Sequence, residues 1–384
     1  MKSFLKKNMS SIIIIGVIAI IGIILAIAIY ITANKEEEKF SVNQDNLIQY
    51  VGSDETVTIE SNIKTIGESV FSSKTKLTTV KFEKKSKLEG IGRSAFEGCT
   101  GLKTVELPGT LKTIGRNAFK DCTSLESIVI PEGVTTIEAY AFKNCSKLVS
   151  ITLPSTLTTL EDGVFEGCSS LVEIKSSSNL VKVENNTLFF NTKLVKYLVS
   201  GNAASYTVPA FVTEIEAYAF QNGETIKQMH VGKNVLKIGT AAFIGCENIE
   251  SITVPFVGLG DVYGDGTYVG GVFANLFSTG MASLPESLVK VEILGGHEIS
   301  TVAFRNCRYL QEIILPNTIK YIGVNAFMGC SGLTKIVIPE SVTYIAPNAF
   351  QNCANVLIKV QGNAEGFEPT WMGNVSADRI EYAK

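Results

Sequence analysis

Eight cysteines are the residues of this chain with the clearest capacity for chemistry, and each follows a phenylalanine by three positions. Such thiols could form disulfides, ligate a metal ion or act as nucleophiles. Zinc is disfavoured because the chain has no Cys-x-x-Cys pair and no cysteine–histidine spacing suited to it. The regular position instead marks a repeat, since Phe-x-x-Cys returns every 23 residues from Phe96 to Phe165. The residues that we assign to this structural repeat are Phe96, Cys99, Phe119, Cys122, Phe142, Cys145, Phe165, Cys168, Phe220, Phe243, Cys246, Phe304, Cys307, Phe327, Cys330, Phe350 and Cys353.

A column of cysteines at one repeat position favours buried free thiols. Coils stacked at about 4.8 Å would bring neighbouring Cα atoms close enough for a disulfide. Side chains in register run parallel, however, so their Cβ atoms would stay at about that separation rather than the ~3.8 Å that a disulfide prefers. Disulfides between neighbouring coils remain the alternative, and they would bend the stack.

No other residues form a catalytic or cofactor-binding constellation, so we expect a protein without enzymatic activity, cofactor or metal. The two histidines, His230 and His297, lie in no metalloprotease motif and beside no nucleophilic serine. Gly258-Leu-Gly260 resembles part of a phosphate loop, but no Gly-Lys-Ser/Thr follows. Asp261 and Asp265 could hold calcium, although the order of ligands in a calcium-binding loop is absent.

Residues 256–290 interrupt the repeat and are the candidate for contact with a partner. Long loops that carry aromatic residues on a rigid scaffold are common contact sites. The residues that we expect to make such contacts are Asp261, Tyr263, Asp265, Tyr268, Phe273 and Phe277. A loop without a function remains the alternative, because long insertions have a low closure cost.

The period of 23 residues predicts a solenoid, in which each coil buries its apolar side against its neighbours. Ile128 and Ile130 alternate as in a strand with one inward face, and Pro131 ends that strand. The unit is too short for a helix pair and has no sustained helical stripe. We therefore predict about twelve parallel β coils, mainly β with short helical or 3-10 turns, over residues 56–358. Residues 359–384 are expected to form a C-terminal cap.

The first forty residues form a separate element. Ile12 to Ile31 is a run of twenty residues without a charge, about the length that crosses a bilayer. We predict a transmembrane signal-anchor helix at 12–33, a cytoplasmic N-terminus at 1–11 and a polar linker at 34–55. Lysines before the run place the N-terminus in the cytoplasm and the repeats outside the cell. Cleavage of this segment as a signal peptide remains open.

The repeat also resembles a known family. Val105-Glu-Leu107-Pro108 leads through Leu111 and Ile114-Gly115 to Ala118-Phe119-Lys-Asp-Cys122, which is similar to the BspA-like (Treponema pallidum-type) leucine-rich repeat. The resemblance covers roughly residues 56–358, and the tail around Gly362 to Trp371 is similar to the C-terminal cap of that family. It implies a leucine-rich-repeat solenoid at the cell surface, associated with adhesion, and no catalytic residue to transfer.

These observations predict a membrane-anchored surface protein that binds protein partners on a host, a neighbouring cell or the envelope. Nucleic acid is an unexpected partner, because the net charge is −3 and no basic face recurs with the repeat. A structural envelope scaffold without a ligand is the alternative. An exported hydrolase is a third possibility, for which the sequence shows no constellation.

Overall fold

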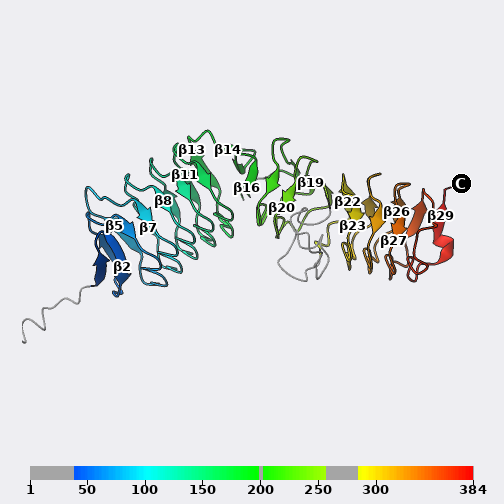
Figure 1. The fold of residues 1–384 in the computed structure, drawn as a ribbon, viewed down its shortest axis with the longest axis horizontal. Coiled ribbons are helices and arrows are strands. Elements are labelled where there is room, and N and C mark those ends of the chain that lie inside the picture. Colours follow the sequence, from blue (N-terminus) through cyan, green and yellow to red (C-terminus); the bar gives the residue numbers. More distant parts are fainter. Residues whose placement is uncertain (1–38, 199–201, 257–283, 384) are drawn as a thin grey trace, which may run out of the picture.

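The structure is a computed structural model that describes residues 39–198, 202–256 and 284–383. Strands stack along one axis into an elongated, mainly parallel β solenoid of about 13 turns (Figure 1). This confirms the predicted leucine-rich-repeat-like solenoid. The predicted short helical segments are mostly hydrogen-bonded turns, and the described residues contain one 3-10 helix, η2 (Ala377–Arg379). No helix in these described ranges is long and apolar enough to cross a membrane, and the anchor predicted at 12–33 lies outside them.

Each regular coil contributes one strand to each of two columns that run along the solenoid. The first column contains three sheets: β3 (Thr56–Ile59), β5 (Thr79–Phe82) and β7 (Thr104–Val105); β9 (Ser127–Val129), β11 (Ser150–Leu153) and β13 (Glu173–Ser176); then β17 (Ser205–Thr207), β19 (Gln228–His230), β21 (Ser251–Val254), β22 (Lys290–Ile293), β24 (Glu312–Ile314), β26 (Lys335–Ile338), β28 (Leu357–Val360) and β29 (Ile380–Tyr382). The second column contains β1 (Phe40–Asn43), β2 (Asn46–Tyr50), β4 (Thr65–Ile66), β6 (Gly90–Ile91), β8 (Thr113–Ile114), β10 (Thr136–Ile137) and β12 (Thr159–Leu160); β14 (Val181–Glu184), β15 (Thr187–Phe190), β16 (Lys193–Tyr197), β18 (Glu214–Ile215) and β20 (Lys237–Ile238); and β23 (Glu298–Ile299), β25 (Tyr321–Ile322) and β27 (Tyr344–Ile345).

Period-two alternation places the aliphatic residues of each coil inside. In β9, Ile128 is buried and Val129 is exposed. Parallel pairing aligns Ile128 with Ile151 in β11, so each aliphatic residue lies above its repeat equivalent. The inner faces therefore form continuous apolar columns, and burying them against neighbouring coils is what stabilises each coil.

The repeated phenylalanines form stacks along the interior. The Phe96 amide donates to the Ala118 carbonyl, and the Phe119 amide donates to the Ala141 carbonyl, each at 2.8 Å. These bonds hold neighbouring rings parallel, with centroids 5.2 Å apart for Phe96–Phe119 and 5.3 Å for Phe119–Phe142. At the C-terminal end Trp371 packs edge-on against Phe350 at 5.8 Å, which ends the stack. β29 adds a further strand to the ladder beside β28, and the cap over residues 359–384 stays a prediction.

The turn that carries each phenylalanine contains a residue with a left-handed backbone. This position is Asn117, Asn325 or Asn348 in three coils, with φ between 55° and 57°. Asparagine tolerates that region well, because its short polar side chain can hydrogen-bond locally. In another coil the same position is Val302, with φ of 54°. A β-branched residue is strained there.

Replacing Val302 with asparagine should therefore raise the thermal unfolding midpoint, by relieving about 1 kcal/mol of backbone strain. The converse change, Asn325→Val, should lower the midpoint by a similar amount. Calorimetry of the two variants beside the parent chain measures both effects. Equal midpoints for all three proteins would show that the left-handed turn is not strained by valine.

The N-terminal end differs from the prediction of a linker over 34–55. Residues 40–50 form an antiparallel hairpin, and β2 continues in parallel pairing to β4 through Leu47 and Ile66. Tyr50 is buried with its ring 5.0 Å from that of Phe71. Apolar residues on one side of the hairpin thus cover the first coil, and the predicted linker was wrong over these residues.

The insertion is also shorter than predicted on its C-terminal side. Leu284 and Leu288 are buried, and β22 pairs with β21 along its whole length. Residues 284–290 therefore belong to a regular coil, so the predicted boundary at 290 was wrong. The remainder of the insertion, 257–283, lies outside the described residues.

An irregular coil in the middle divides the interior into two cores. Here β14, β15 and β16 form an antiparallel sheet, and β16 pairs in parallel with β18. All four residues of β15 are buried. Leu188 and Phe190 belong to the N-terminal core, whereas Phe189 belongs to the C-terminal core. Strands β14, β15 and β16, which we call the wall, thus separate the two cores, with one face packed on each. The axis of the stack changes direction near them in Figure 1.

Candidate interaction surface

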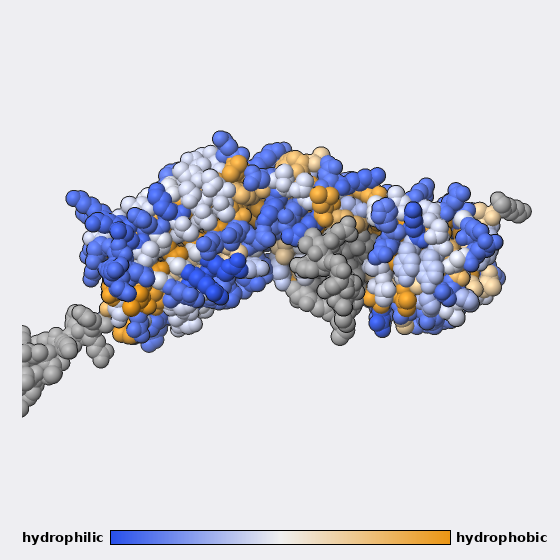
Figure 2. Space-filling model, viewed as in Figure 1, coloured by the Kyte–Doolittle hydropathy of each residue, from blue (hydrophilic) through white to orange (hydrophobic). Residues whose placement is uncertain are grey.

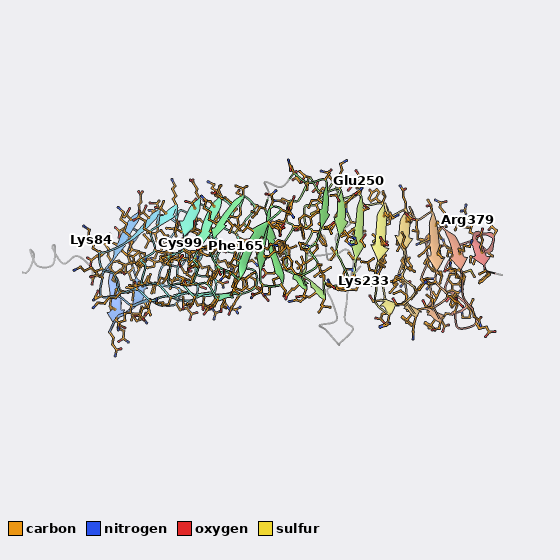
Figure 3. The ribbon with its side chains drawn as sticks, turned by 90° about the horizontal axis from the view of Figure 1, so that it is seen from above. Lys84, Cys99, Phe165, Lys233, Glu250 and Arg379 are labelled. Carbon is orange, nitrogen blue, oxygen red and sulfur yellow. The ribbon has the colours of Figure 1, made fainter. Side chains whose placement is uncertain are left out.

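The cysteine column lies inside the solenoid and offers no reactive site. All eight cysteines are free and buried. The Cys99 thiol donates a hydrogen bond to the Phe71 carbonyl at 3.0 Å, and the Cys122 thiol donates to the Phe96 carbonyl at 3.2 Å. Burial raises the pKa of Cys99 to about 12 and that of Cys122 well above its ordinary value. Figure 3 places Cys99 within the body of the molecule, whereas Lys84 and Arg379 lie towards its two ends. Such thiols are packing residues rather than nucleophiles.

Unreduced protein should therefore yield all eight thiols when it is denatured, and almost none while it is folded. The folded protein protects them because the sulfur atoms are buried and protonated. Titration with a colorimetric disulfide reagent, with and without denaturant, measures both numbers. A count far below eight after denaturation would favour disulfides between coils.

The other predicted chemical residues do not form a site in the described structure. His230 lies on β19 and His297 just before β23, and both side chains are exposed. Two further strands of the first column, β21 and β22, separate them along the chain. The described residues contain no group of three or more metal-ligating side chains. The proposed contact residues Asp261, Tyr263, Asp265, Tyr268, Phe273 and Phe277 lie outside the described residues.

In most regular coils the position directly after the buried aliphatic residue of the second column carries glycine or glutamate, and Ser300 and Ala346 are the exceptions. At Gly115 a Cβ atom would lie 2.8 Å from the Ile91 carbonyl oxygen, so the coils approach too closely for a side chain. Where glutamate occupies this position, its carboxylate accepts a backbone N–H of an earlier coil. Glu138 accepts from Arg116 at 2.8 Å, and Glu161 accepts from Ala139 at 2.9 Å.

Glu216 uses the same position to bridge the irregular coil. Its Oε2 accepts the Gly163 amide at 3.2 Å, across 53 positions of the chain. Lys193 lies between Glu216, at 3.6 Å, and Asp162, with which it forms a close ion pair. Glu216 is 4% exposed, and its Oε1 has no hydrogen-bond partner in the described structure. Burial raises the pKa of Glu216 to about 7 despite the nearby Lys193 ammonium.

A second buried charge lies in the wall itself. Lys196 is 1% exposed, and its ammonium donates one long hydrogen bond, to the Tyr218 carbonyl at 3.5 Å. Burial lowers the pKa of Lys196 to about 8, while the neighbouring Cys168 and Cys246 oppose that shift. Burying a lysine ammonium is costly when one long hydrogen bond is all that replaces its hydration. The junction between the two cores therefore carries an electrostatic cost in the buried Lys196.

Two hollows lie on the surface beside this junction. One is polar, has a volume of about 400 Å³ and is lined by Arg116, Ala139, Tyr140, Leu160, Glu161, Asp162 and Lys193. The other, which we call the valine groove, has a volume of about 410 Å³ and is lined by residues 129–132, 152–154 and 175–177. Val129 in the valine groove is 64% exposed. Pro131 and Pro154 line it where β9 and β11 end.

The valine groove has the composition of a protein contact surface. Val129 is its exposed apolar residue, the buried Ile130 and Leu153 lie beneath, and Glu132 and Lys175 give it a charged rim. Val149 and Val172, directly before β11 and β13, add exposed apolar area at the other end of the same sheet. Apolar patches rimmed by polar residues mark interaction sites on soluble surfaces. Sequence reasoning missed this groove, because the positions aligned with Val129 in the next two coils are Thr152 and Lys175, so no apolar pattern recurs there.

The stacked coils, the two strand columns and the buried Phe-x-x-Cys positions define a leucine-rich-repeat solenoid. The model of the BspA type leucine-rich repeat region matches residues 37–122, 89–205, 197–258 and 284–368. The chain therefore belongs to the BspA-type leucine-rich repeat family. This confirms the resemblance drawn from the sequence.

Solved structures agree with this fold. The pneumococcal vaccine antigen PcpA is 22% identical, with a TM-score of 0.57 over 86% of this chain and 79% of its own. A leucine-rich repeat protein from Eubacterium ventriosum is 22% identical, with a TM-score of 0.58 over 81% of this chain and 89% of its own. A leucine-rich repeat protein from Bacteroides ovatus is 22% identical, with a TM-score of 0.55 over 90% of this chain and 88% of its own. The search of curated proteins gave no match.

Proposed function

We propose that this protein is a membrane-anchored solenoid at the cell surface that binds a protein partner and has no catalytic role. The single observation that carries the binding proposal is the valine groove, an exposed apolar hollow with a charged rim on a rigid parallel sheet. Solenoids use such extended, preformed surfaces for recognition. The uncharged run Ile12–Ile31 supports the anchor, and the lysines before it support an external solenoid.

The rigid frame explains how the contact would work. The groove residues come from three neighbouring coils whose strands are fixed by parallel pairing of Ile128, Ile151 and Ile174. A partner would thus meet side chains that are already ordered, and little conformational entropy would be lost on binding. The partner that fits is a protein with an apolar segment flanked by charges, on a host cell, a neighbouring cell or the envelope.

A charge placed in the valine groove should weaken partner binding at least tenfold, because it must be desolvated against an apolar surface. Val129→Lys is the variant, and Leu236→Lys is the matched control, since Leu236 is 68% exposed and lies outside the groove. The measurement is binding of purified protein to target cells or envelope extract, followed by titration against the captured partner. Equal binding by both variants would remove the groove from the proposal.

The insertion is the second place where a partner could bind. Deleting residues 259–282 should weaken binding and leave the thermal midpoint unchanged. The deletion must end before Leu284, because Leu284 is buried in the next coil. If neither this deletion nor Val129→Lys changes binding, the structural envelope scaffold becomes the better description.

A further inference from the structure

The N-terminal end of the solenoid is apolar. Three large side chains of the hairpin and the residue after it, Val42, Ile48 and Val51, are between 43% and 54% exposed. Of these three, Val42 lines an apolar hollow together with Phe40, Leu47, Ile59 and Ile63, with Glu60 as its one charged residue. Figure 2 shows hydrophobic residues gathered at this end of the molecule. This end therefore exposes apolar surface that neither core covers.

The hairpin leaves this surface open because it caps only one of the two columns. β2 pairs with β4 and thus covers the second column. In the first column β3 is an edge strand, and its one strand partner in the described structure is β5. The hollow lies between the hairpin and this uncapped edge, since both Val42 of β1 and Ile59 of β3 line it.

Acidic residues around the patch are partly neutralised by lysines. Lys39 pairs with Asp54 at 3.0 Å, and Lys64 pairs with Asp45 at 2.7 Å. The Tyr50 hydroxyl also donates to Asp54 at 2.6 Å. An apolar patch ringed by paired charges suits the boundary between lipid headgroups and acyl chains, where apolar side chains enter and polar groups stay hydrated.

We infer that the N-terminal end of the solenoid rests directly on the bilayer surface, with Val42, Ile48 and Val51 at the headgroup boundary. This inference rests on the anchor of the proposed function. Because the hairpin begins at Phe40, six residues, 34–39, separate it from the predicted transmembrane segment 12–33. Six residues span at most about 20 Å, so the end of the solenoid stays within about that distance of the membrane and can contact it. Residues 35–39, Lys-Glu-Glu-Glu-Lys, are too charged to fill the apolar hollow themselves.

The test uses tryptophan fluorescence of the full chain in phosphatidylcholine vesicles with brominated acyl chains, which quench tryptophan on contact. The chain has a single tryptophan, Trp371, which is buried at the far end and reports an intact fold. Ile48→Trp places a probe in the patch, and Val51→Trp is a second variant in case the first does not fold. Leu236→Trp is the control, because Leu236 is exposed directly before β20, in the middle of the solenoid rather than at its end. Flotation of the vesicles measures anchoring independently.

The expected result is that the protein floats with the vesicles and that only the Ile48→Trp and Val51→Trp probes lose emission in brominated lipid. Flotation without quenching of either probe would leave the anchor in place and overturn the contact. Quenching of the Leu236→Trp probe as well would mean that the solenoid lies flat on the bilayer, which also overturns end-on contact. Protein that does not float would overturn both the anchor and the contact that depends on it.

Discussion

Replacing Phe119 with alanine is expected to lower the free energy of unfolding by about 3–5 kcal/mol, the usual cost of removing a buried aromatic ring. Phe119 is 0% exposed and lies between the parallel rings of Phe96 and Phe142, with centroids 5.2 and 5.3 Å away. Backbone hydrogen bonds at 2.8 Å fix the spacing of these coils, so they cannot collapse into the cavity. Denaturant titration followed by circular dichroism measures the loss.

Phe211→Ala is the matched control for this prediction. Phe211 is also a phenylalanine of the solenoid, but it is 38% exposed. Its removal should cost less than about 1.5 kcal/mol, because little buried area is lost and no closed cavity forms. If the two variants lost the same stability, the ring stack would not be the source of cohesion between coils.

The second large effect is the pH dependence that Glu216 and Lys196 impose: their joint contribution to stability is lowest between about pH 7 and 8. The pKa of Glu216 rises from 4.5 in the unfolded chain to about 7 in the fold. The folded protein thus keeps a proton that the unfolded chain releases, and this contribution to stability, complete below pH 4.5, is lost as the pH rises through 7. The pKa of Lys196 falls from 10.5 to about 8, so the cost of burying its charge is relieved only as the pH rises from 8 to 10.5. Each change corresponds to about 3 kcal/mol.

Two variants separate these contributions from those of other titrating groups. Glu216→Gln keeps an acceptor for the Gly163 amide and should remove the fall between pH 4.5 and 7. Lys196→Met should stabilise the protein by about 3 kcal/mol near pH 7 and by progressively less above pH 8. Lys84→Met, at an exposed lysine, serves as the control. Differences that do not vary with pH for either variant would show that these groups titrate normally.

Burial sets the direction of both pKa shifts, and the charged neighbours change their size. Glu216 faces Lys193 and the Gly163 amide, which favour its charge, and Asp162 and Glu214, which oppose it. Lys196 is influenced by Cys168, Cys246 and Glu166, which favour its charge. In both cases burial is the larger effect, because the wall is packed against a core on each side.

The regular coils could be predicted from the sequence because their chemistry repeats. Phe119 and Cys122 return at a fixed interval. The proline after the first strand of one coil shows where that strand ends, and the interval then places the strands of the other coils. The same logic could have found two features that were misjudged. Phe40-x-Val42 and Leu47-Ile48-x-Tyr50 flank Asn43-Gln44-Asp45-Asn46, which has the composition of a hairpin turn. Leu288-x-x-Val291-x-Ile293 repeats the spacing of Leu148-x-x-Ile151-x-Leu153.

The junction could not be predicted in the same way, because it depends on contacts between coils that are not neighbours. Glu216 occupies a position that holds glycine in other coils, and only the structure places its carboxylate against Gly163. Lys196 stands in the run Leu194-Val195-Lys196-Tyr197-Leu198, which marks it as unusual, but its burial follows from a wall with a core on each face. The valine groove likewise depends on how three coils align.

Labelling of intact cells with a membrane-impermeant amine reagent tests the central claim most directly. The solenoid carries exposed lysines such as Lys84 and Lys85, which should be modified on whole cells to the same extent as after lysis. Mass spectrometry of the recovered protein gives the extent at each site, with a cytoplasmic protein as the internal control. Modification of these lysines only after lysis would contradict a solenoid held outside the cell.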